Sequence, residues 1–461
     1  MYKVLILVPH PDDEIIVAGG LFNQFENINA NVSVCITTNG DYISNLAETR
    51  IFETLKARKI FNYDNLYILG YGDDYQGKHI YEGLDHEVLM SVAGKYETYN
   101  LSHIKTYHQI KYGRQAKYTR NNYKNDLREL ILDIKANLII CVDNDKHVEH
   151  RTLSLLFDEV IGEIIKSTDY RPIILKMFAY IGAYDAIRDY FYRPMIVTKP
   201  SYKACIKDND CVFPYDWNER IQIANLKSNY SLLFWKSPIF KALKAHRTQR
   251  ASIRFDQICN ADIVAWERRT DNLLLKANIE ASSGNISFIN DFKLVETENI
   301  RSNSWIIPQS VNRCWSPSNE DVYKTIRISF NESVTISKIV IYQNIQSHFD
   351  CLELEVDNRF KKQYESDGYK TSIEFFPLQN VKLINLRFKG TEIYINEIEV
   401  FESINSNIWR YLPLERYNSP KECFSLKFKM FHKILFDIYK IINIDKRMLV
   451  RFLKKYIYIN K

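Results

Sequence analysis

Short apolar runs alternate with longer amphipathic stretches through the first 282 residues of the chain. Short continuous apolar runs are typical of buried strands, and apolar residues three and four positions apart indicate helices. Strands separated by helices predict a mostly parallel sheet with helices on both faces, the Rossmann-like α/β class. We expect strands at residues 3–8, 31–37, 66–69, 138–142 and 173–180, and helices at residues 14–28, 46–61, 125–135 and 148–166.

The hydrophobic pattern changes after the polar residues 281–285. Apolar and polar residues now alternate one by one, as at Ile326, Ile328 and Phe330, and again over residues 382–388 and 392–401. This spacing is typical of strands that bury one face. Residues 286–403 are therefore expected to form an all-β jelly-roll sandwich.

A third pattern begins near residue 420 and runs to residue 461. One apolar stripe at helical spacing predicts an amphipathic helix. Its members are Phe424, Phe428, Phe431, Leu435, Ile438 and Ile442. A second short helix is expected over residues 449–456. The organisation predicted for the chain is an α/β domain over residues 1–282, a β-sandwich over 286–403 and a basic helical tail over 420–461.

The positive charge of the chain is concentrated in this tail. Residues 421–461 contain eleven Lys/Arg and three Asp/Glu, a net charge of +8, while the whole chain carries +6. A basic amphipathic helix favours peripheral contact with an anionic membrane. Docking on the body of the protein and a dimer interface are the alternatives. No nucleic-acid motif accompanies the charge, so we expect no nucleic-acid partner.

The cellular location is predicted from what the sequence does not contain. The eight cysteines are scattered and form no pair at close spacing, which argues against a disulfide framework. Residues 3–8 read as a buried strand and not as a signal peptide. We expect a cytoplasmic protein, at the cytoplasmic face of the membrane if the tail binds lipid.

Ionisable residues follow two of the predicted strands. Residues 10–14 read His-Pro-Asp-Asp-Glu after the first strand, and residues 143–150 contain two histidines after the strand at 138–142. Ligands bind at the carboxyl ends of strands in sheets of this class. Between them, the basic, Tyr-containing residues 96–120 are expected to form either a loop over a substrate or a solvated insertion.

The two segments together contain the residue types of a catalytic zinc site. Such a site takes three His or carboxylate ligands and leaves one position open, and His10, Asp13 and His150 would supply them. Zinc lowers the pKa of its bound water from about 15.7 to about 7, and a carboxylate that does not bind metal must then take the proton. Asp12 suits that role. His147, one turn before His150, would stabilise the oxyanion.

Several of these residues also have a structural interpretation. Asp12 and Asp13 would cap a helix that begins near residue 14. Arg50 and Glu53 are spaced as a surface pair on one helix, which competes with a role in substrate binding. His246 is expected to pack or to cap.

The motif Pro9-His-Pro-Asp-Asp-Glu14 with a later His147-x-x-His150 resembles the PIG-L (LmbE-like) family of zinc N-acetylglucosaminyl deacetylases. The resemblance covers roughly residues 1–275 and includes Arg50-x-x-Glu53, Leu69-Gly-Tyr-Gly-Asp73 and Lys244-Ala-His-Arg-Thr-Gln249 in a late helix. It implies His10, Asp13 and His150 as zinc ligands, Asp12 as general base and His147 as the oxyanion-stabilising residue. It also implies that Arg50 and Asp73 contact the sugar.

The second motif departs from the family, because His147-Val-Glu-His150 stands where His-Pro-Asp-His is usual. Glu149 is expected to orient a histidine as that Asp would. The later module, with Trp315-Ser-Pro317 and Asn396-Glu-Ile-Glu-Val400, resembles a discoidin-like (coagulation-factor C-type, galactose-binding-like) domain. The resemblance leaves a sugar-binding and a purely structural role open for it.

These observations predict zinc-dependent hydrolysis of the N-acetyl group of a GlcNAc-like residue. The substrate is expected in a lipid-linked saccharide or a precursor of a cell-surface polysaccharide. The competing hypothesis is a non-catalytic carbohydrate-binding scaffold with a structural zinc site. Asp12 argues against that alternative, since a structural zinc needs no base.

Overall fold

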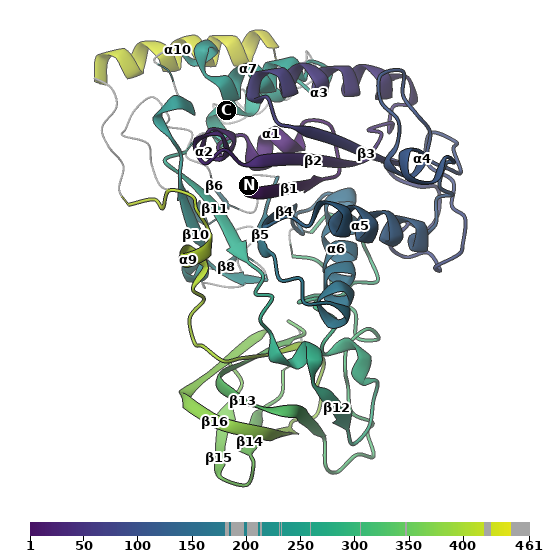
Figure 1. Ribbon diagram of the computed structural model, residues 1–461, viewed down its shortest axis with the longest axis vertical. Coiled ribbons are helices and arrows are strands. Elements are labelled where there is room, and N and C mark those ends of the chain that lie inside the picture. The colour runs from purple at the N-terminus through teal and green to yellow at the C-terminus, as the bar shows by residue number, and fades with distance from the viewer. Residues whose placement is uncertain are drawn as a thin grey trace, which may run out of the picture.

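The protein is built from an α/β unit and an all-β unit, which lie at opposite ends of the molecule in Figure 1. The computed structural model describes residues 1–179, 184–185, 198–200, 211–212, 214–229, 231, 233–258, 260–304, 306–345, 348–418 and 426–443. The predicted fold classes are confirmed for both units.

The α/β unit is organised around a seven-stranded sheet. Its five parallel strands are β1 (Lys3–Val8), β2 (Asn31–Thr38), β3 (Asn65–Tyr71), β4 (Leu138–Val142) and β5 (Ile173–Met177). Two strands that the sequence pattern did not predict extend it in antiparallel pairing, β10 (Ile221–Ala224) and β11 (Asp262–Glu267). The strand order β10-β11-β5-β4-β1-β2-β3 places β1 beside β4. The carboxyl ends of these two strands are therefore neighbours.

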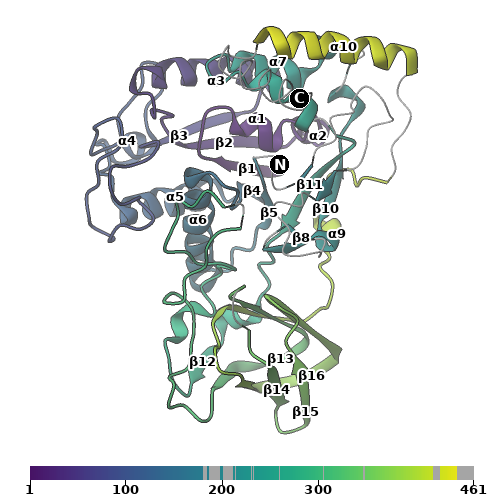
Figure 2. The same ribbon diagram turned by 180° about the vertical axis from the view of Figure 1, so that it is seen from behind.

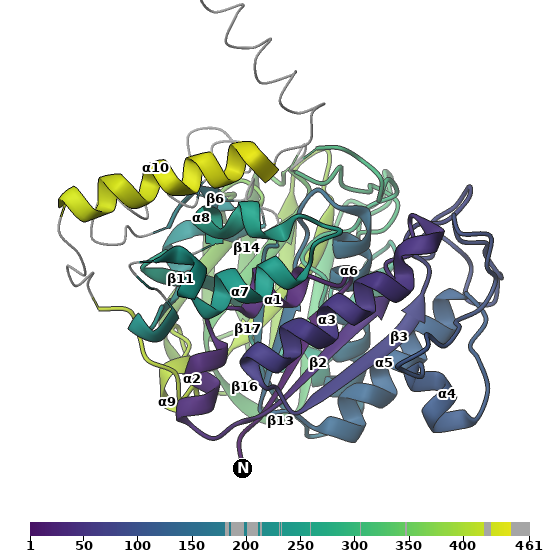
Figure 3. The ribbon, with the colours of Figure 1, turned by 90° about the horizontal axis from the view of Figure 1, so that it is seen from above.

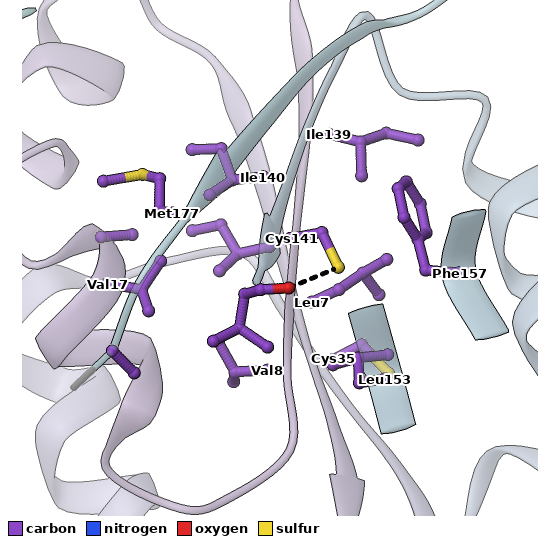
Figure 4. Close-up of a cluster of buried hydrophobic side chains, with 14 of the residues drawn as sticks. Leu7, Val8, Val17, Cys35, Ile139, Ile140, Cys141, Leu153, Phe157 and Met177 are labelled. Carbon is purple, nitrogen blue, oxygen red and sulfur yellow. Dashed lines mark hydrogen bonds between the residues drawn. The ribbon is translucent and has the colours of Figure 1, made fainter. Parts of the chain in front are cut away.

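Helices cover both faces of this sheet, as Figure 1 shows. One layer contains α1 (Asp13–Ala18), α2 (Phe22–Asn27), α3 (Ala47–Phe61) and α7 (Pro238–Ala245), and the other contains α5 (Arg120–Ile134) and α6 (Val148–Ser167). Side chains of β1 and β4 point alternately toward the two helix layers, as Figure 4 shows. Val8 and Ile140 lie toward Val17 of α1. Leu7 lies on the other side, toward Phe157 of α6. All are buried, which explains the continuous apolar runs of these strands.

The helix expected at residues 14–28 is divided into α1 and α2 at Gly19 and Gly20. Two successive glycines weaken a helix, at about 1 kcal/mol each relative to alanine. A Cβ atom on Gly20 would lie 2.6 Å from Ile263 Cδ1, so a larger residue there would require the Ile263 side chain of β11 to shift. The late helix expected to include residues 244–249 also ends early, because α7 stops at Ala245.

Residues 96–120 are not a solvated insertion. They contain the short helix α4 (Tyr107–Tyr112), and the side chains of Tyr107, His108 and Tyr118 are buried. His108 Nδ1 donates to Asp126 Oδ1 of α5 at 2.7 Å. The insertion is therefore a packed extension of the α/β unit.

The second unit is a β-sandwich made from one continuous antiparallel set of strands. Its members are β12 (Asn278–Ala281), β13 (Thr325–Gln343), β14 (Cys351–Val356), β15 (Phe360–Glu365), β16 (Lys370–Lys389) and β17 (Ile395–Phe401). The register between β13 and β16 shifts several times between Ser329 and Lys338. These irregularities let both long strands bend and contribute to two layers. Trp315 is fully buried in the core between them.

Buried polar contacts hold the two units together. The Arg268 guanidinium is 2% exposed and donates to Glu399 Oε1 of β17 at 2.8 Å and to the Phe292 carbonyl at 2.7 Å. On α6, Gly162 lies directly against the segment between β12 and β13 of the sandwich. A Cβ atom there would be 2.8 Å from Asp291 O and 2.9 Å from Phe292 Cβ.

The described part of the tail is the helix α10 (Leu426–Asn443), which lies beside α7 in Figures 1 and 2. Phe436 is buried, with ring centroids 4.9 Å from Phe234 and 5.9 Å from Phe255. Tyr439 bonds Ser252 Oγ through its hydroxyl at 2.8 Å. Docking on the body, one of the three readings of the tail, is therefore observed for this helix.

The predicted apolar stripe of the tail is only partly correct. Ile438 and Ile442 are exposed, because the buried side of α10 is rotated toward Phe436 and Tyr439. Phe424, the side chains of Phe428 and Phe431, and the second predicted helix at residues 449–456 lie outside the described part of the chain. None of the described helices is long and apolar enough to cross a membrane.

Gly162→Ala tests the contact between the two units. Alanine alone would stabilise a helix by about 1 kcal/mol, but overpacking against Asp291 and Phe292 costs about 1–3 kcal/mol. We expect a lower melting temperature by differential scanning calorimetry. Glu163→Ala, the exposed neighbour on α6, is the control and should change stability by less than about 0.5 kcal/mol. A higher melting temperature for Gly162→Ala would contradict the close contact.

Candidate metal centre

The two ionisable segments meet at the carboxyl ends of β1 and β4, as the sequence predicted. His10 follows β1, and His147 and His150 lie at the start of α6, which follows β4. His10 and His147 border a pocket of about 400 Å³, which is also lined by Asp12, Asp13, Arg50 and Asp73, and His150 lies buried behind Asp13. This volume is within the range of small-molecule sites.

Asp13 links the two segments directly. Its Oδ2 atom lies 3.0 Å from His10 Nδ1 and 3.2 Å from His150 Nε2, and it accepts the His10 backbone N–H at 3.1 Å. All three side chains are buried. One carboxylate oxygen thus stands between two imidazoles from different parts of the chain.

The three histidines also form one group. Nitrogen atoms of His10, His147 and His150 all lie within 4.8 Å of one another. The His10 ring centroid is 4.6 Å from that of His147 and 5.4 Å from that of His150. A metal ion could therefore be held by His10, Asp13 and His150, or by the three histidines.

The charges in the cluster fit a cation. Burial alone would lower the pKa of His10, but the carboxylates of Asp73 and Asp13 outweigh it and raise that pKa to about 10. The pKa of His150 is raised for the same reason. Burial would lower it, but the carboxylates of Asp145 and Asp13 have the larger effect and raise it to about 9. Burial also disfavours the Asp13 carboxylate, yet the two imidazoles hold its pKa well below the usual range. The carboxylates thus favour the protonated, positively charged form of both imidazoles. A bound metal ion would replace these protons and supply the positive charge instead.

His147 differs from the other two histidines. Burial, together with the charges of His10 and His150, lowers its pKa to about 2, so the ring is neutral. Its Nδ1 atom accepts the Glu149 backbone N–H at 3.3 Å, where His147 caps α6. A neutral ring that accepts at Nδ1 carries its proton on Nε2. His147 is therefore prepared to donate a hydrogen bond from Nε2.

Asp12 does not cap α1 with its side chain, although it occupies the N-cap position. Its backbone has a φ of 115°, and its N–H donates to Glu14 Oε2 at 2.9 Å. Glu14 is held in turn by His246 Nε2 at 3.2 Å, which confirms a packing role for His246. Burial and the neighbouring Asp13 carboxylate raise the pKa of Asp12 to about 6. The capping interpretation fails, and the Asp12 carboxyl lines the pocket instead.

Arg50 and Asp73 lie together beside the cluster. Arg50 Nη1 is 3.4 Å from Asp73 Oδ2, and His10 Nε2 is 3.1 Å from Asp73 Oδ1. Arg50 also donates to the carbonyls of Gly40 and Pro11, both at 3.2 Å. Gly40 has a φ of 62°, which favours glycine, and a Cβ atom there would lie 2.9 Å from Arg50 Nη1.

The surface pair of Arg50 with Glu53 is not observed. Both side chains are buried, and Glu53 instead accepts the Thr248 backbone N–H at 2.9 Å. Arg50 therefore belongs to the pocket and not to the outer surface of α3.

Sequence reasoning missed the residues that position the cluster. Asp145 Oδ2 accepts a hydrogen bond from His150 Nδ1 at 2.6 Å. Asp41 Oδ1 accepts the Asp73 backbone N–H at 2.9 Å. Asp145 stands five residues before His150 on the preceding loop, so no helical spacing relates them. The only available signal was the run Asp143-Asn-Asp145 at a strand end.

Glu149 does not orient a histidine of the cluster, contrary to expectation. Its Oε1 atom accepts the Asp74 backbone N–H and a hydrogen bond from His79 Nε2, both at 2.8 Å. Thr152 Oγ1 lies 3.0 Å from His79 Nδ1 on the other side of that ring. The longer side chain thus ties α6 to the loop after β3, and Asp145 orients His150.

Comparison with known proteins identifies the region that contains this cluster. Residues 5–161 match the PIG-L family, described as GlcNAc-PI de-N-acetylase, so this part of the chain is a PIG-L domain. None of the curated proteins matches the chain in sequence.

Several solved structures are similar to parts of the chain. N,N'-diacetylchitobiose deacetylase from Pyrococcus horikoshii is 15% identical, with 54% of this chain and 70% of that chain covered and a TM-score of 0.30. The family 32 carbohydrate-binding module of Clostridium perfringens NanJ, in complex with galactose, is 14% identical, with 27% and 92% covered and a TM-score of 0.20. An F5/8 type C domain from Bacteroides fragilis is 10% identical, with 28% and 91% covered and a TM-score of 0.21. TM-scores of this size do not establish a shared fold.

Asp145→Asn tests the positioning of His150. The amide cannot serve as the same charged acceptor for His150 Nδ1, so zinc affinity should fall by about 10- to 100-fold when titrated against a chelator. Asp126→Asn is the matched control, because Asp126 accepts from His108 Nδ1 in the same way but away from the cluster. Equal zinc affinity in the Asp145 variant and the native chain would contradict the assignment.

Proposed function

We propose that this chain is a zinc-dependent amide hydrolase that removes the acetyl group from a GlcNAc-like residue. The observation that carries the proposal is the buried Asp12 carboxyl, which lines the pocket beside His10, Asp13 and His150. The PIG-L match of residues 5–161 supports the same reaction class.

The residues proposed to hold zinc are His10, Asp13 and His150. Both His nitrogens that face Asp13 lie within 3.2 Å of its Oδ2 atom, so the three donors already converge. His147 is left out of this set because a ring that carries its proton on Nε2 serves better as a donor. When bound, zinc would act as a Lewis acid on the acetyl carbonyl and would make a water molecule acidic.

Asp12 is proposed as the general base and then the general acid. Its raised pKa of about 6 is close to neutral pH, where one group can both take and return a proton. Asp12 takes the proton of the attacking water and passes it to the amide nitrogen as the C–N bond breaks. The products are acetate and the free amine.

His147 is proposed to stabilise the negative charge that develops on the acetyl oxygen. A neutral imidazole that donates from Nε2 provides a fixed hydrogen bond in a buried site, where such bonds are strong. Arg50 and Asp73 are proposed to bind sugar hydroxyl groups. Their contacts with His10 and with the backbone hold both side chains at the edge of the pocket.

The proposed natural substrate is a lipid-linked saccharide or a precursor of a cell-surface polysaccharide, met at the cytoplasmic face of the membrane. The +8 charge of residues 421–461 supports contact of the tail with anionic lipid. The alternative is a carbohydrate-binding scaffold with a structural zinc. The Asp12 carboxyl argues against it, because that group caps no helix and lines the pocket, with Asp12 Oδ1 3.7 Å from Arg50 Nη2.

Asp12→Asn separates these two functions. Acetate release from N,N'-diacetylchitobiose, used as a soluble probe, should fall by at least about 100-fold because the amide cannot accept the proton. Zinc content should be retained. Glu48→Gln, on the exposed surface of α3, serves as the control and should keep the native rate. Acetate release at the native rate by the Asp12 variant would exclude the proposed mechanism.

A further inference from the structure

The outer side of α10 exposes an apolar stripe. Ile434, Ile438, Ile441 and Ile442 are 55%, 47%, 54% and 74% exposed. Their spacing of four, three and one places them on one face of the helix. The opposite face is already used, since Phe436 and Tyr439 pack on α7 and the residues after it. α10 is therefore apolar on two sides, and only one side is covered by described residues.

Further exposed apolar side chains lie on the elements beside α10. Trp235, just before α7, is 41% exposed, and its ring lies 4.9 Å from that of Phe234, which contacts Phe436. On α3, Phe52 is 46% exposed. Figures 1 and 3 both show α3, α7 and α10 side by side at the end of the molecule away from the β-sandwich. We call this surface the α3–α7–α10 face.

The same face is strongly basic. Residues 236–254 contain six Lys/Arg and no Asp/Glu. Lys236, Lys241, Lys244, Arg247 and Arg250 of this segment are exposed. On α3, Lys56 lies 4.2 Å from the centroid of the Phe52 ring. Exposed Ile, Trp and Phe side chains on this face thus lie close to Lys and Arg side chains. A surface that is both apolar and basic favours binding at the interface of an anionic bilayer.

Two chain segments next to this face also line the pocket beside the His/Asp cluster. Tyr42, Ile43 and Leu46, which lead into α3, line one side of the pocket. Gln249 and Arg254, which follow α7, line another. Tyr42 and Ile43 are 64% and 56% exposed, so the rim of the pocket is itself apolar. The rim and the basic face belong to the same two chain segments.

We propose that the α3–α7–α10 face docks on an anionic phospholipid bilayer and places the mouth of the pocket at the lipid surface. Apolar side chains enter the interface, and the surrounding Lys and Arg side chains meet lipid phosphates. The docking face would give the pocket access to a sugar attached to a lipid. This inference extends the membrane contact of the proposed function from the tail to the α/β unit, and it does not depend on the chemical reaction.

Two other occupants fit the face less well. A symmetric dimer would bring the same lysines of both copies together, and like charges repel. Nucleic acid would match the charge but would leave the exposed isoleucines without a role. An anionic bilayer offers phosphate groups to the Lys and Arg side chains and an apolar interior to the isoleucines.

Vesicle co-sedimentation of the full-length chain tests the proposal. We expect binding to phosphatidylcholine vesicles that contain phosphatidylglycerol, weakened by salt, and little binding to phosphatidylcholine alone. The double variant Lys241→Glu/Lys244→Glu should bind anionic vesicles about tenfold or more weakly. Ile438→Asn/Ile441→Asn, which changes only exposed side chains, should also weaken binding. Lys361→Glu/Lys362→Glu, on exposed positions of β15, is the matched control and should bind as the native chain does.

The outcomes separate this proposal from the proposed reaction. Native acetate release from the soluble probe, together with weakened vesicle binding in both α7 and α10 variants, supports the docking face. Vesicle binding that persists without any acetate release would reject the deacetylase and leave the face intact. Equal binding by the native chain and the Lys241/Lys244 variant would overturn the face. The proposal would also be overturned if the chain did not bind vesicles but bound nucleic acid through Lys241 and Lys244.

Discussion

The site depends on the Asp13 carboxylate, whose single oxygen lies within 3.2 Å of two histidines from distant parts of the chain. This arrangement requires that β1 and β4 be neighbours in parallel register, which the pairing of Val4 with Leu138 through Leu7 with Cys141 provides. It also requires a buried carboxylate that stays charged, which the two imidazoles ensure by lowering the pKa of Asp13. An isolated buried charge would be expensive, so the three groups stabilise one another.

The same constraint determines where Asp12 can lie. With Asp13 turned toward the histidines, the preceding residue adopts a φ of 115°, which costs about 1–3 kcal/mol for a residue with a side chain. The hydrogen bond from the Asp12 N–H to Glu14, and that from His246 to Glu14, hold this conformation. The local strain leaves the Asp12 carboxyl free of a capping bond and places it on the pocket. Two adjacent aspartates thus acquire different environments.

The sequence predicted those features that depend on local pattern. Buried strands appear as continuous apolar runs, and the carboxyl ends of β1 and β4 could be located from them. It could not predict Asp145 or Asp41, because their roles depend on loop conformations that no periodicity records. The rotation of α10 was also missed, since Leu435, Phe436, Ile438 and Tyr439 offer two apolar sides, and only the surface formed by Phe234 and Phe255 decides which one is buried.

Metal analysis of the purified chain tests the central claim, that His10, Asp13 and His150 form a zinc centre. The account predicts one tightly bound zinc ion per chain by mass spectrometry of the native protein, which disappears in His10→Ala and in His150→Ala. Variants that remain folded by circular dichroism and still carry the same zinc as the native chain would contradict it, as would a native chain that binds no zinc at neutral pH.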